Sequence, residues 1–312
     1  MASALDVLER IGNTALIELQ RIKPDNGVRI LVKLESENPS GSMKDRMAPA
    51  IIKAAEADRR LKPGGSVVEY TGGSTGVSLA LVCAVKGYPL RIVTSDAFAR
   101  EKLLHMEALG ARLHIIASES GRMTEKLTRD MIAAARRIAK TEGSFWVDQM
   151  NNRDQLAAYH EMADEILRDS GGRADAFVQS VGTAASLRGI AEALRAHEKT
   201  TKIIAVEPAE SAVLSGGPSG AHKIDGIGAG YVVPLWQKDI ADRIERISTD
   251  EAKATAQRLA REEGLFGGTS TGANIVAALR IAEDLPAGAT VVTVMCDTGM
   301  KYLSKPNRPS RG

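Results

Sequence analysis

Short β-branched runs alternate with longer amphipathic stretches along most of this 312-residue chain. Such an alternation builds right-handed βαβ units, in which parallel strands form sheets that helices cover on both faces. Because the strands are more numerous than one twisted sheet usually holds, we expect an α/β fold with two sheets. The predicted strands are Val28–Leu34, Ser66–Tyr70, Leu90–Thr94, Arg112–Ile116, Phe145–Val147, Ala176–Val181, Lys202–Val206 and Thr290–Met295. The predicted helices are one that starts near Lys44, then Val77–Val85, Arg100–Leu109, Arg122–Ala139, Asp154–Arg168, Leu187–Ala196, Asp250–Glu262 and Ala273–Glu283.

The composition and charge describe an ordinary globular protein. Apolar residues make up 44% of the chain and charged residues 26%, and the formal net charge is +2. Lysine and arginine are spread along the chain, so no nucleic-acid-binding or membrane-surface patch is indicated. Residues 1–21 carry acidic side chains and no continuous apolar stretch, unlike a signal or transit peptide. We therefore expect a cytoplasmic protein that acts on small molecules.

The cysteines and histidines do not form a metal-binding pattern. Cys83 and Cys296 both lie in apolar patterns without a partner at ligand spacing, so we predict reduced core residues. The five histidines are scattered and give no pair at helical ligand spacing. We expect no metal.

The segment Asn38–Arg46 places Lys44 in a turn of small residues between a predicted strand and a predicted helix. The start of a helix has unpaired backbone N–H groups that attract anions and disfavour a further positive charge. We therefore predict a lowered pKa for Lys44. A neutral amine is the form that reacts with an aldehyde to give a Schiff base. Taken alone, the segment is more typical of a solvated surface lysine, and it is the rest of the chain that favours the reactive amine.

Further glycine-rich turns follow predicted strands or precede predicted helices. Those around Thr71–Gly76, Gly182–Ser186 and Gly267–Gly272 combine small residues with hydroxyl groups at a helix start, which suits a carboxylate or a phosphate. The Gly226–Gly230 segment has G-x-G-x-G spacing, but it follows no strand and opens no helix, so a dinucleotide site is disfavoured. No P-loop and no serine-hydrolase motif occurs. One lysine and several anion-binding turns favour a phosphate-bearing organic cofactor bound as an imine.

These motifs resemble the cysteine synthase and cystathionine β-synthase family. The likeness runs from Ile11–Leu16 to Gly299–Ser304 in the family's order and spacing. It implies pyridoxal 5′-phosphate as cofactor and the tryptophan-synthase-β-like fold of type II pyridoxal-phosphate enzymes, with two three-layer α/β/α lobes. The larger, cofactor-binding lobe would comprise residues 1–40 and 151–312. The smaller, mobile lobe would comprise residues 41–150 and carry the turn that receives the substrate carboxylate.

The resemblance also implies roles for individual residues. Lys44 would be the catalytic Schiff-base lysine, and Ser270 would face the pyridine nitrogen of the cofactor. A serine hydroxyl can bond a neutral nitrogen without fully protonating it, which suits prompt loss of a β-leaving group. Ser74 stands where the family has an asparagine that bonds the cofactor's ring hydroxyl. Residues of the cofactor phosphate site would be Gly182, Thr183, Ala184, Ala185 and Ser186, and those of the substrate site Thr71, Gly72, Gly73, Thr75, Gln149 and Gly226.

Four positions depart from the family's usual pattern. Gly72 lacks the serine hydroxyl and Ser74 is shorter than the asparagine, which changes the hydrogen bonds offered to substrate and cofactor. Ala184 and Ala185 stand in place of glycines, and since alanine disfavours positive φ we expect this turn to follow a different path.

The resemblance implies β-replacement on a β-substituted L-serine through an aminoacrylate intermediate. O-acetyl-L-serine with sulfide, giving L-cysteine and acetate, is the default. Elimination or racemisation of the serine/threonine dehydratase type, formation of cystathionine or diaminopropionate, and a catalytically silent cofactor-binding relative remain alternatives. Partners would be the amino-acid substrate and a thiol or sulfide, with no nucleic acid and no membrane, and a homodimer is expected from the resemblance alone.

Overall fold

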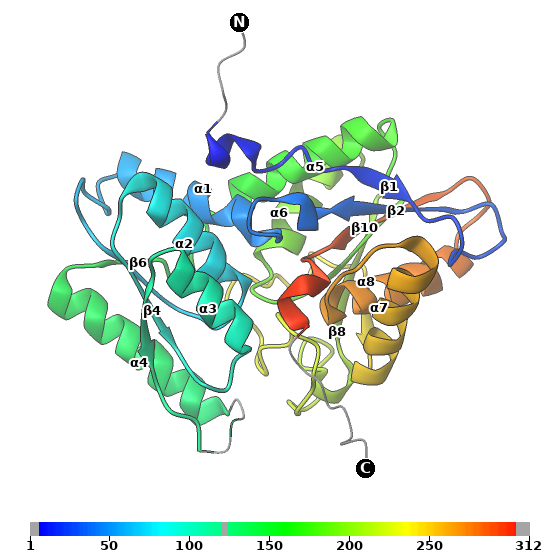
Figure 1. Ribbon diagram of the computed structural model, residues 1–312. Coiled ribbons are helices and arrows are strands. Elements are labelled where there is room, and N and C mark those ends of the chain that lie inside the picture. The colour runs from blue at the N-terminus through cyan, green and yellow to red at the C-terminus, as the bar shows by residue number, and fades with distance from the viewer. Residues whose placement is uncertain (1–5, 120, 122–123, 304–312) are drawn as a thin grey trace, which may run out of the picture.

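The computed structural model describes residues 6–119, 121 and 124–303, which form two sheets with helices packed on them (Figure 1). The larger sheet has six strands and the smaller four, and all neighbouring strands are parallel except the antiparallel first pair. The α/β class with two sheets is confirmed. In order across the larger sheet lie β1 (Leu16–Glu18), β2 (Arg29–Leu34), β10 (Thr290–Met295), β7 (Ala176–Ser180), β8 (Lys202–Pro208) and β9 (Arg243–Ile247). In order across the smaller sheet lie β5 (Arg112–Ile115), β4 (Leu90–Thr94), β3 (Val67–Tyr70) and β6 (Phe145–Trp146).

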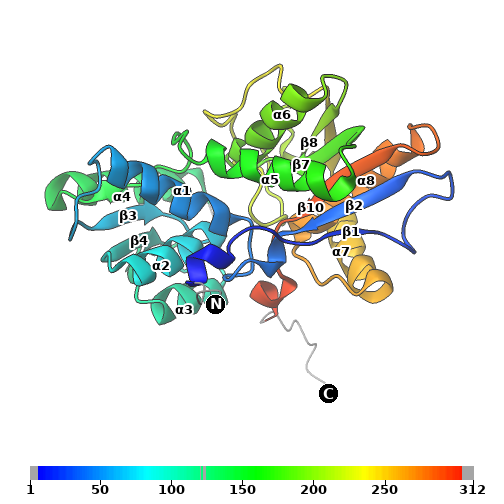
Figure 2. The ribbon, with the colours of Figure 1, turned by 90° about the horizontal axis from the view of Figure 1, so that it is seen from above.

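Helices lie on both faces of each sheet, as the two views show (Figure 2). One apolar core includes side chains of α1 (Lys44–Ala57), α2 (Ser74–Lys86), α3 (Arg100–Ala108), α5 (Leu156–Ser170) and α6 (Ala185–His197), and it runs between the two sheets. A second core lies under α7 (Thr249–Glu263) and α8 (Thr269–Glu283), and a third under α4 (Glu125–Glu142). Short 3₁₀ helices are η1 (Val7–Arg10), η2 (Glu35–Glu37), η3 (Ala209–Ser211) and η4 (Gly299–Tyr302).

Glycines end four of the eight α-helices in the part of the chain that the structure describes. The helices α2, α4, α5 and α7 each end at a glycine with positive φ, which releases the chain from the helix without a Cβ clash. The predicted starting residue of the fourth helix, Arg122, lies outside the described residues, and α4 begins at Glu125. Two strands were not predicted: β1 has only three residues, and three of the five residues of β9 are charged.

Two further features bear on the sequence-based expectations. Cys83 and Cys296 are buried free thiols, as predicted. Among the described residues, no helix combines the length and the apolar character needed to cross a membrane.

Candidate active site

Lys44 is the first residue of α1, and its amine has no hydrogen-bond partner among the described residues. Burial lowers the pKa of Lys44, while the nearby Cys296 and Asp297 act in the opposite direction. The predicted direction of the shift is confirmed, but its predicted cause is wrong, because burial and not the helix start is responsible. A buried amine without a partner is poised to lose its proton and act as a nucleophile.

The turn that carries Lys44 is attached to the segment that follows β10. The Met43 N–H donates to the Cys296 carbonyl at 2.9 Å, and the Thr298 N–H donates to the Gly41 carbonyl at 3.0 Å. Gly41 has φ +75°, and a Cβ there would lie 2.7 Å from the Thr298 methyl carbon. The turn therefore requires glycine, and Lys44 is held against the carboxyl end of the central strand of the larger sheet.

A buried ionic cluster fixes the direction of α1. Arg46 donates to Glu35 from Nε at 2.7 Å and to Glu165 from Nη1 and Nη2 at 2.8 and 2.7 Å. Lys33 of β2 contacts the same Glu165 at 2.8 Å. Because these charges are buried and mutually compensated, the helix that starts at Lys44 is fastened to β2 and α5.

The turn after β3 brings the predicted substrate residues together. The Thr75 hydroxyl donates to Gln149 Oε1 at 2.7 Å, and the Gly73 N–H donates to the Thr71 hydroxyl at 3.1 Å. The Gln149 N–H in turn donates to the buried carboxyl of Glu69 at 3.1 Å. Burial raises the pKa of Glu69 to about 8, so this carboxyl keeps its proton at neutral pH. Glu69 was not predicted, because only its burial sets it apart from other acidic residues.

Gly72 has no room for a side chain. Its Cα lies against the ring of Phe98, so closely that a Cβ at position 72 would overlap the ring atoms. Phe98 belongs to the loop between β4 and α3. The carboxyl ends of β4 and β3 lie side by side because the two strands are parallel neighbours. The sequence marked Gly72 as unusual but gave no sign of its partner.

The turn Gly182–Ser186 follows β7 and leads into α6. A Cβ on Gly182 would lie 2.5 Å from the Gly226 carbonyl oxygen, and the Gly228 N–H donates to the Val181 carbonyl at 3.0 Å. The two predicted glycine loops therefore touch. Ala184 has φ +69°, so the turn holds an alanine in a conformation that alanine disfavours, and a path different from that of a glycine turn stays a prediction. A non-glycine residue in this strained region is typical of functional sites.

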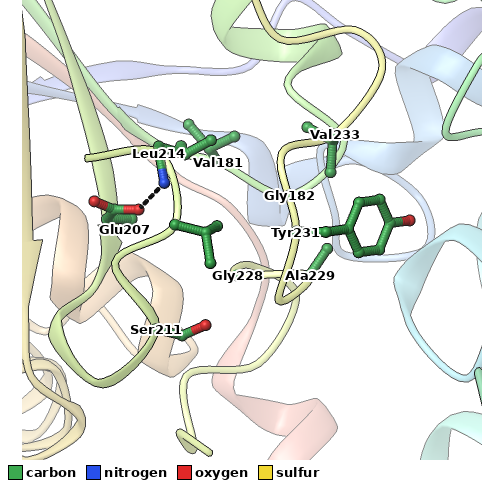
Figure 3. A pocket seen from close by; sticks show the side chains of 10 residues that line it. Val181, Gly182, Glu207, Ser211, Leu214, Gly228, Ala229, Tyr231 and Val233 are labelled. Carbon is green, nitrogen blue, oxygen red and sulfur yellow. Dashed lines mark hydrogen bonds between the residues drawn. The ribbon is translucent and has the colours of Figure 1, made fainter. Parts of the chain in front are cut away.

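A cavity of about 10 Å³ lies behind this turn, between Val181, Gly182, Gly228 and Tyr231 (Figure 3). It has room for about one water molecule and cannot hold a cofactor. Tyr231 on its rim interacts with Tyr70 of the smaller sheet. The loop that contains Gly226 therefore reaches from the Gly182–Ser186 turn to the smaller sheet.

Ser270 lies near the start of α8, and its hydroxyl lies beside the Cys296 thiol. Burial raises the pKa of Cys296 to about 11, so the thiol stays protonated and uncharged. Since Cys296 also lies beside Lys44, Ser270 and Lys44 belong to one site. A buried free amine, a strained small-residue turn at a helix start and a second helix start with a serine fit an aldehyde cofactor that carries a phosphate.

Comparison with known proteins agrees with this geometry. A family model described as pyridoxal-phosphate dependent enzyme matches residues 7–297. The chain belongs to this enzyme family. A cysteine synthase of Staphylococcus aureus is 37% identical over 304 residues, which cover 96% of each chain.

Two solved structures share the fold of this pyridoxal-phosphate-dependent enzyme. A cysteine synthase of Entamoeba histolytica superposes with a TM-score of 0.91 at 38% identity, over 97% of this chain and 90% of the other. An O-ureido-L-serine synthase superposes with a TM-score of 0.91 at 34% identity, over 97% and 95%. The predicted family, fold and cofactor are confirmed: the protein is a pyridoxal-phosphate-dependent enzyme of the cysteine synthase type.

Proposed function

We propose that the protein catalyses β-replacement on a β-substituted L-serine, with O-acetyl-L-serine and sulfide as the default pair and L-cysteine and acetate as products. The observation that carries this proposal is the half-buried Lys44 side chain, whose amine has no hydrogen-bond partner within the described part of the chain and a pKa lowered by desolvation. The cysteine synthases of Staphylococcus aureus and Entamoeba histolytica support the choice of substrates. In this role the protein would belong to cysteine biosynthesis.

Pyridoxal phosphate, when bound to the lysine, supplies an electron-withdrawing ring next to the substrate's α-carbon. Lys44 Nζ takes the α-proton as a general base, a task that suits an amine of lowered pKa. The Ser270 hydroxyl would donate a hydrogen bond to the ring nitrogen. A hydroxyl can do so without transferring its proton to the nitrogen. Residues that hold the cofactor phosphate are Gly182, Thr183, Ala184, Ala185 and Ser186.

The substrate carboxylate binds at the start of α2. The N–H groups of Gly72 and Thr75 and the Thr71 hydroxyl offer donors there, while the Gly73 N–H and the Thr75 hydroxyl hold the turn together through Thr71 and Gln149. Gly226 lies at the substrate-side entrance. We assign residues 1–40 and 151–312 to the larger lobe and 41–150 to a smaller lobe that closes over the substrate and excludes water. The protein acts in the cytoplasm as a homodimer.

A visible absorption spectrum of purified protein tests the role of Lys44. We expect a visible band from covalently bound cofactor, and its loss in Lys44→Ala. Cysteine formation from O-acetyl-L-serine and sulfide then tests the reaction. If the visible band of the wild-type protein persisted in Lys44→Ala, the assignment of Lys44 as the residue that holds the cofactor would be overturned.

The altered carboxylate turn motivates a second candidate. Phe98 fills the space next to Gly72, so the substrate site differs from one with a serine at that position. The similarity to an O-ureido-L-serine synthase supports a different nucleophile, and cystathionine- or diaminopropionate-forming reactions belong to the same class. Analysis of the products formed with several nucleophiles separates these β-replacement reactions from one another. Pyruvate formation at an equal rate without nucleophile would favour dehydratase-type elimination, and no spectral change with O-acetyl-L-serine would indicate a silent relative.

A further inference from the structure

Lys301 of η4 is a second buried amine close to Lys44. Its side chain is 7% exposed, and Nζ donates to the Ser74 hydroxyl at 3.3 Å. Among the described residues this hydroxyl is its one hydrogen-bond partner, although an ammonium group has three N–H donors. A buried cation with two unused donors is costly unless a ligand satisfies it.

Asp297 lies on the other side of the same serine. The Ser74 hydroxyl donates to Asp297 Oδ2 at 3.3 Å, and the Tyr302 hydroxyl donates to the same oxygen at 2.6 Å. The second oxygen, Oδ1, is buried and has no donor within the described chain. The group formed by Ser74, Asp297 and Lys301 therefore has spare donors and a spare acceptor next to Lys44.

The charges around Lys301 come from several elements. Burial lowers the pKa of Lys301 to about 8, against the opposing effect of the two nearby carboxylates. A bound anion would raise the pKa of Lys301 and keep its amine protonated. The titratable groups that face it are Asp45 and Lys44 of α1, Lys102 and His105 of α3, and Asp297 and Tyr302 at the carboxyl end of the larger sheet.

The chemistry of pyridoxal phosphate supplies a fitting ligand. Its aldehyde-bearing ring carbon has the phenolic oxygen on one side and the phosphate-bearing arm on the other. If Lys44 holds the aldehyde and the turn before α6 holds the phosphate, the phenolic oxygen points away from that turn. The group of Ser74, Asp297 and Lys301 joins the segment after β10 to the turn after β3 of the smaller sheet, whereas the turn before α6 follows β7 of the larger sheet.

We propose that Lys301 binds the phenolic oxygen of the cofactor, with Ser74 and Asp297 positioning its ammonium group. A positive charge at this place keeps the oxygen ionised and so maintains the visible-absorbing form of the bound cofactor. The inference rests on the proposed role of Lys44.

The test compares Lys301→Met, Lys301→Arg and, as a matched control, Lys102→Met, in cofactor-loaded protein without substrate. Lys102 is buried in the same region, but its ammonium lies 4.3 Å from the centre of the Tyr302 ring. We expect Lys301→Met to lose visible absorption to a near-ultraviolet band at neutral pH. Its dissociation constant for pyridoxal phosphate should rise roughly ten- to hundredfold, as for loss of a charged hydrogen bond. Lys301→Arg and Lys102→Met should retain the wild-type band.

Three outcomes would overturn this proposal. An unchanged band in Lys301→Met, with weaker binding of the amino acid alone, would assign Lys301 to the substrate carboxylate instead. Equal changes in Lys102→Met would indicate a general effect of charge. A wild-type protein without the visible band would overturn the role of Lys44, and this inference with it. If Lys301→Met fails to fold, Ser74→Ala replaces it, because this substitution removes the hydroxyl that positions the Lys301 amine. An unchanged spectrum of Ser74→Ala would also count against the proposal.

Discussion

The ring of Phe98 occupies the space that any side chain at position 72 would need. The two residues come from loops that follow neighbouring parallel strands, β4 and β3, so both lie at the edge of the smaller sheet that faces the site. Phe98 packs on the same apolar cluster as Tyr70, which fixes the ring in place. The shape of the proposed carboxylate turn therefore depends on a residue outside it.

Gly72→Ser should weaken binding of the amino-acid substrate, because the new side chain displaces Phe98 or distorts the turn. Overpacking of this kind costs about 1–3 kcal/mol, so we expect KM to rise about tenfold with a smaller change in cofactor affinity. Steady-state kinetics and a cofactor titration measure the two effects. In the double variant Gly72→Ser/Phe98→Ala, the KM should return toward that of Phe98→Ala, and additive losses would contradict the steric explanation.

Gly182→Ala should loosen the cofactor phosphate site. Its Cβ would lie 2.5 Å from the backbone carbonyl oxygen of Gly226, which cannot move without shifting the loop. We expect about a tenfold weaker affinity for pyridoxal phosphate, measured by titration of apoprotein, because the phosphate-binding N–H groups change position. An unchanged affinity for pyridoxal phosphate would show that the Gly226 loop moves to make room for the new methyl group, and would contradict this prediction.

Arg46→Met should strongly destabilise the fold. The substitution leaves Glu35 and Glu165 buried without their shared partner, and breaking a buried ion pair costs about 3–5 kcal/mol. Urea unfolding of the apoprotein measures the loss. Arg173→Met is the matched control, since the pair of Arg173 with Asp175 is exposed and should contribute less than about 1 kcal/mol. Equal losses in the two variants would contradict the role of the buried cluster.

Glu69 should make stability fall as pH rises from about 4.5 to 8. Burial raises its pKa to about 8 in the folded protein, whereas an unfolded glutamate titrates at about 4.3. Between these values the folded state binds more protons, so each pH unit lowers the free energy of unfolding by up to about 1.4 kcal/mol. Glu69→Gln cannot titrate and should lack this component. Urea unfolding at several pH values would contradict the assignment if the difference between the two proteins stayed constant.

Local patterns in the sequence predicted the framework of the site. Lys44 begins a helix, and the glycine-rich turns follow β3 and β7 or open α8, because strand periodicity, small residues and helix starts are local features. The strand β1 was not predicted because three residues are too few to show a period, and β9 was not predicted because charged residues occupy three of its five positions. Ala184 shows that surrounding contacts can hold an alanine at positive φ against its local preference.

Contacts between distant segments could not be predicted in this way. Phe98 against Gly72 and Lys301 against Ser74 depend on how the loops pack, and no spacing in the sequence indicates either pair. The same holds for the pKa shifts of Lys44 and Glu69, because both result from burial in the folded structure. The sequence predicted which turns form the candidate site, and packing determined which distant side chains contact those turns.

The pairing of β2 with β10 has a consequence for biogenesis. Arg29–Leu34 lie in register beside Thr290–Met295, so the centre of the larger sheet joins residues about as far apart as the chain allows. A ribosome must deliver nearly all of the polypeptide before that sheet can assemble, whereas the strands of the smaller sheet all emerge between residues 67 and 146. Because the Lys44 turn is fastened to the segment after β10, Lys44 acquires its surroundings only in the last stage of folding.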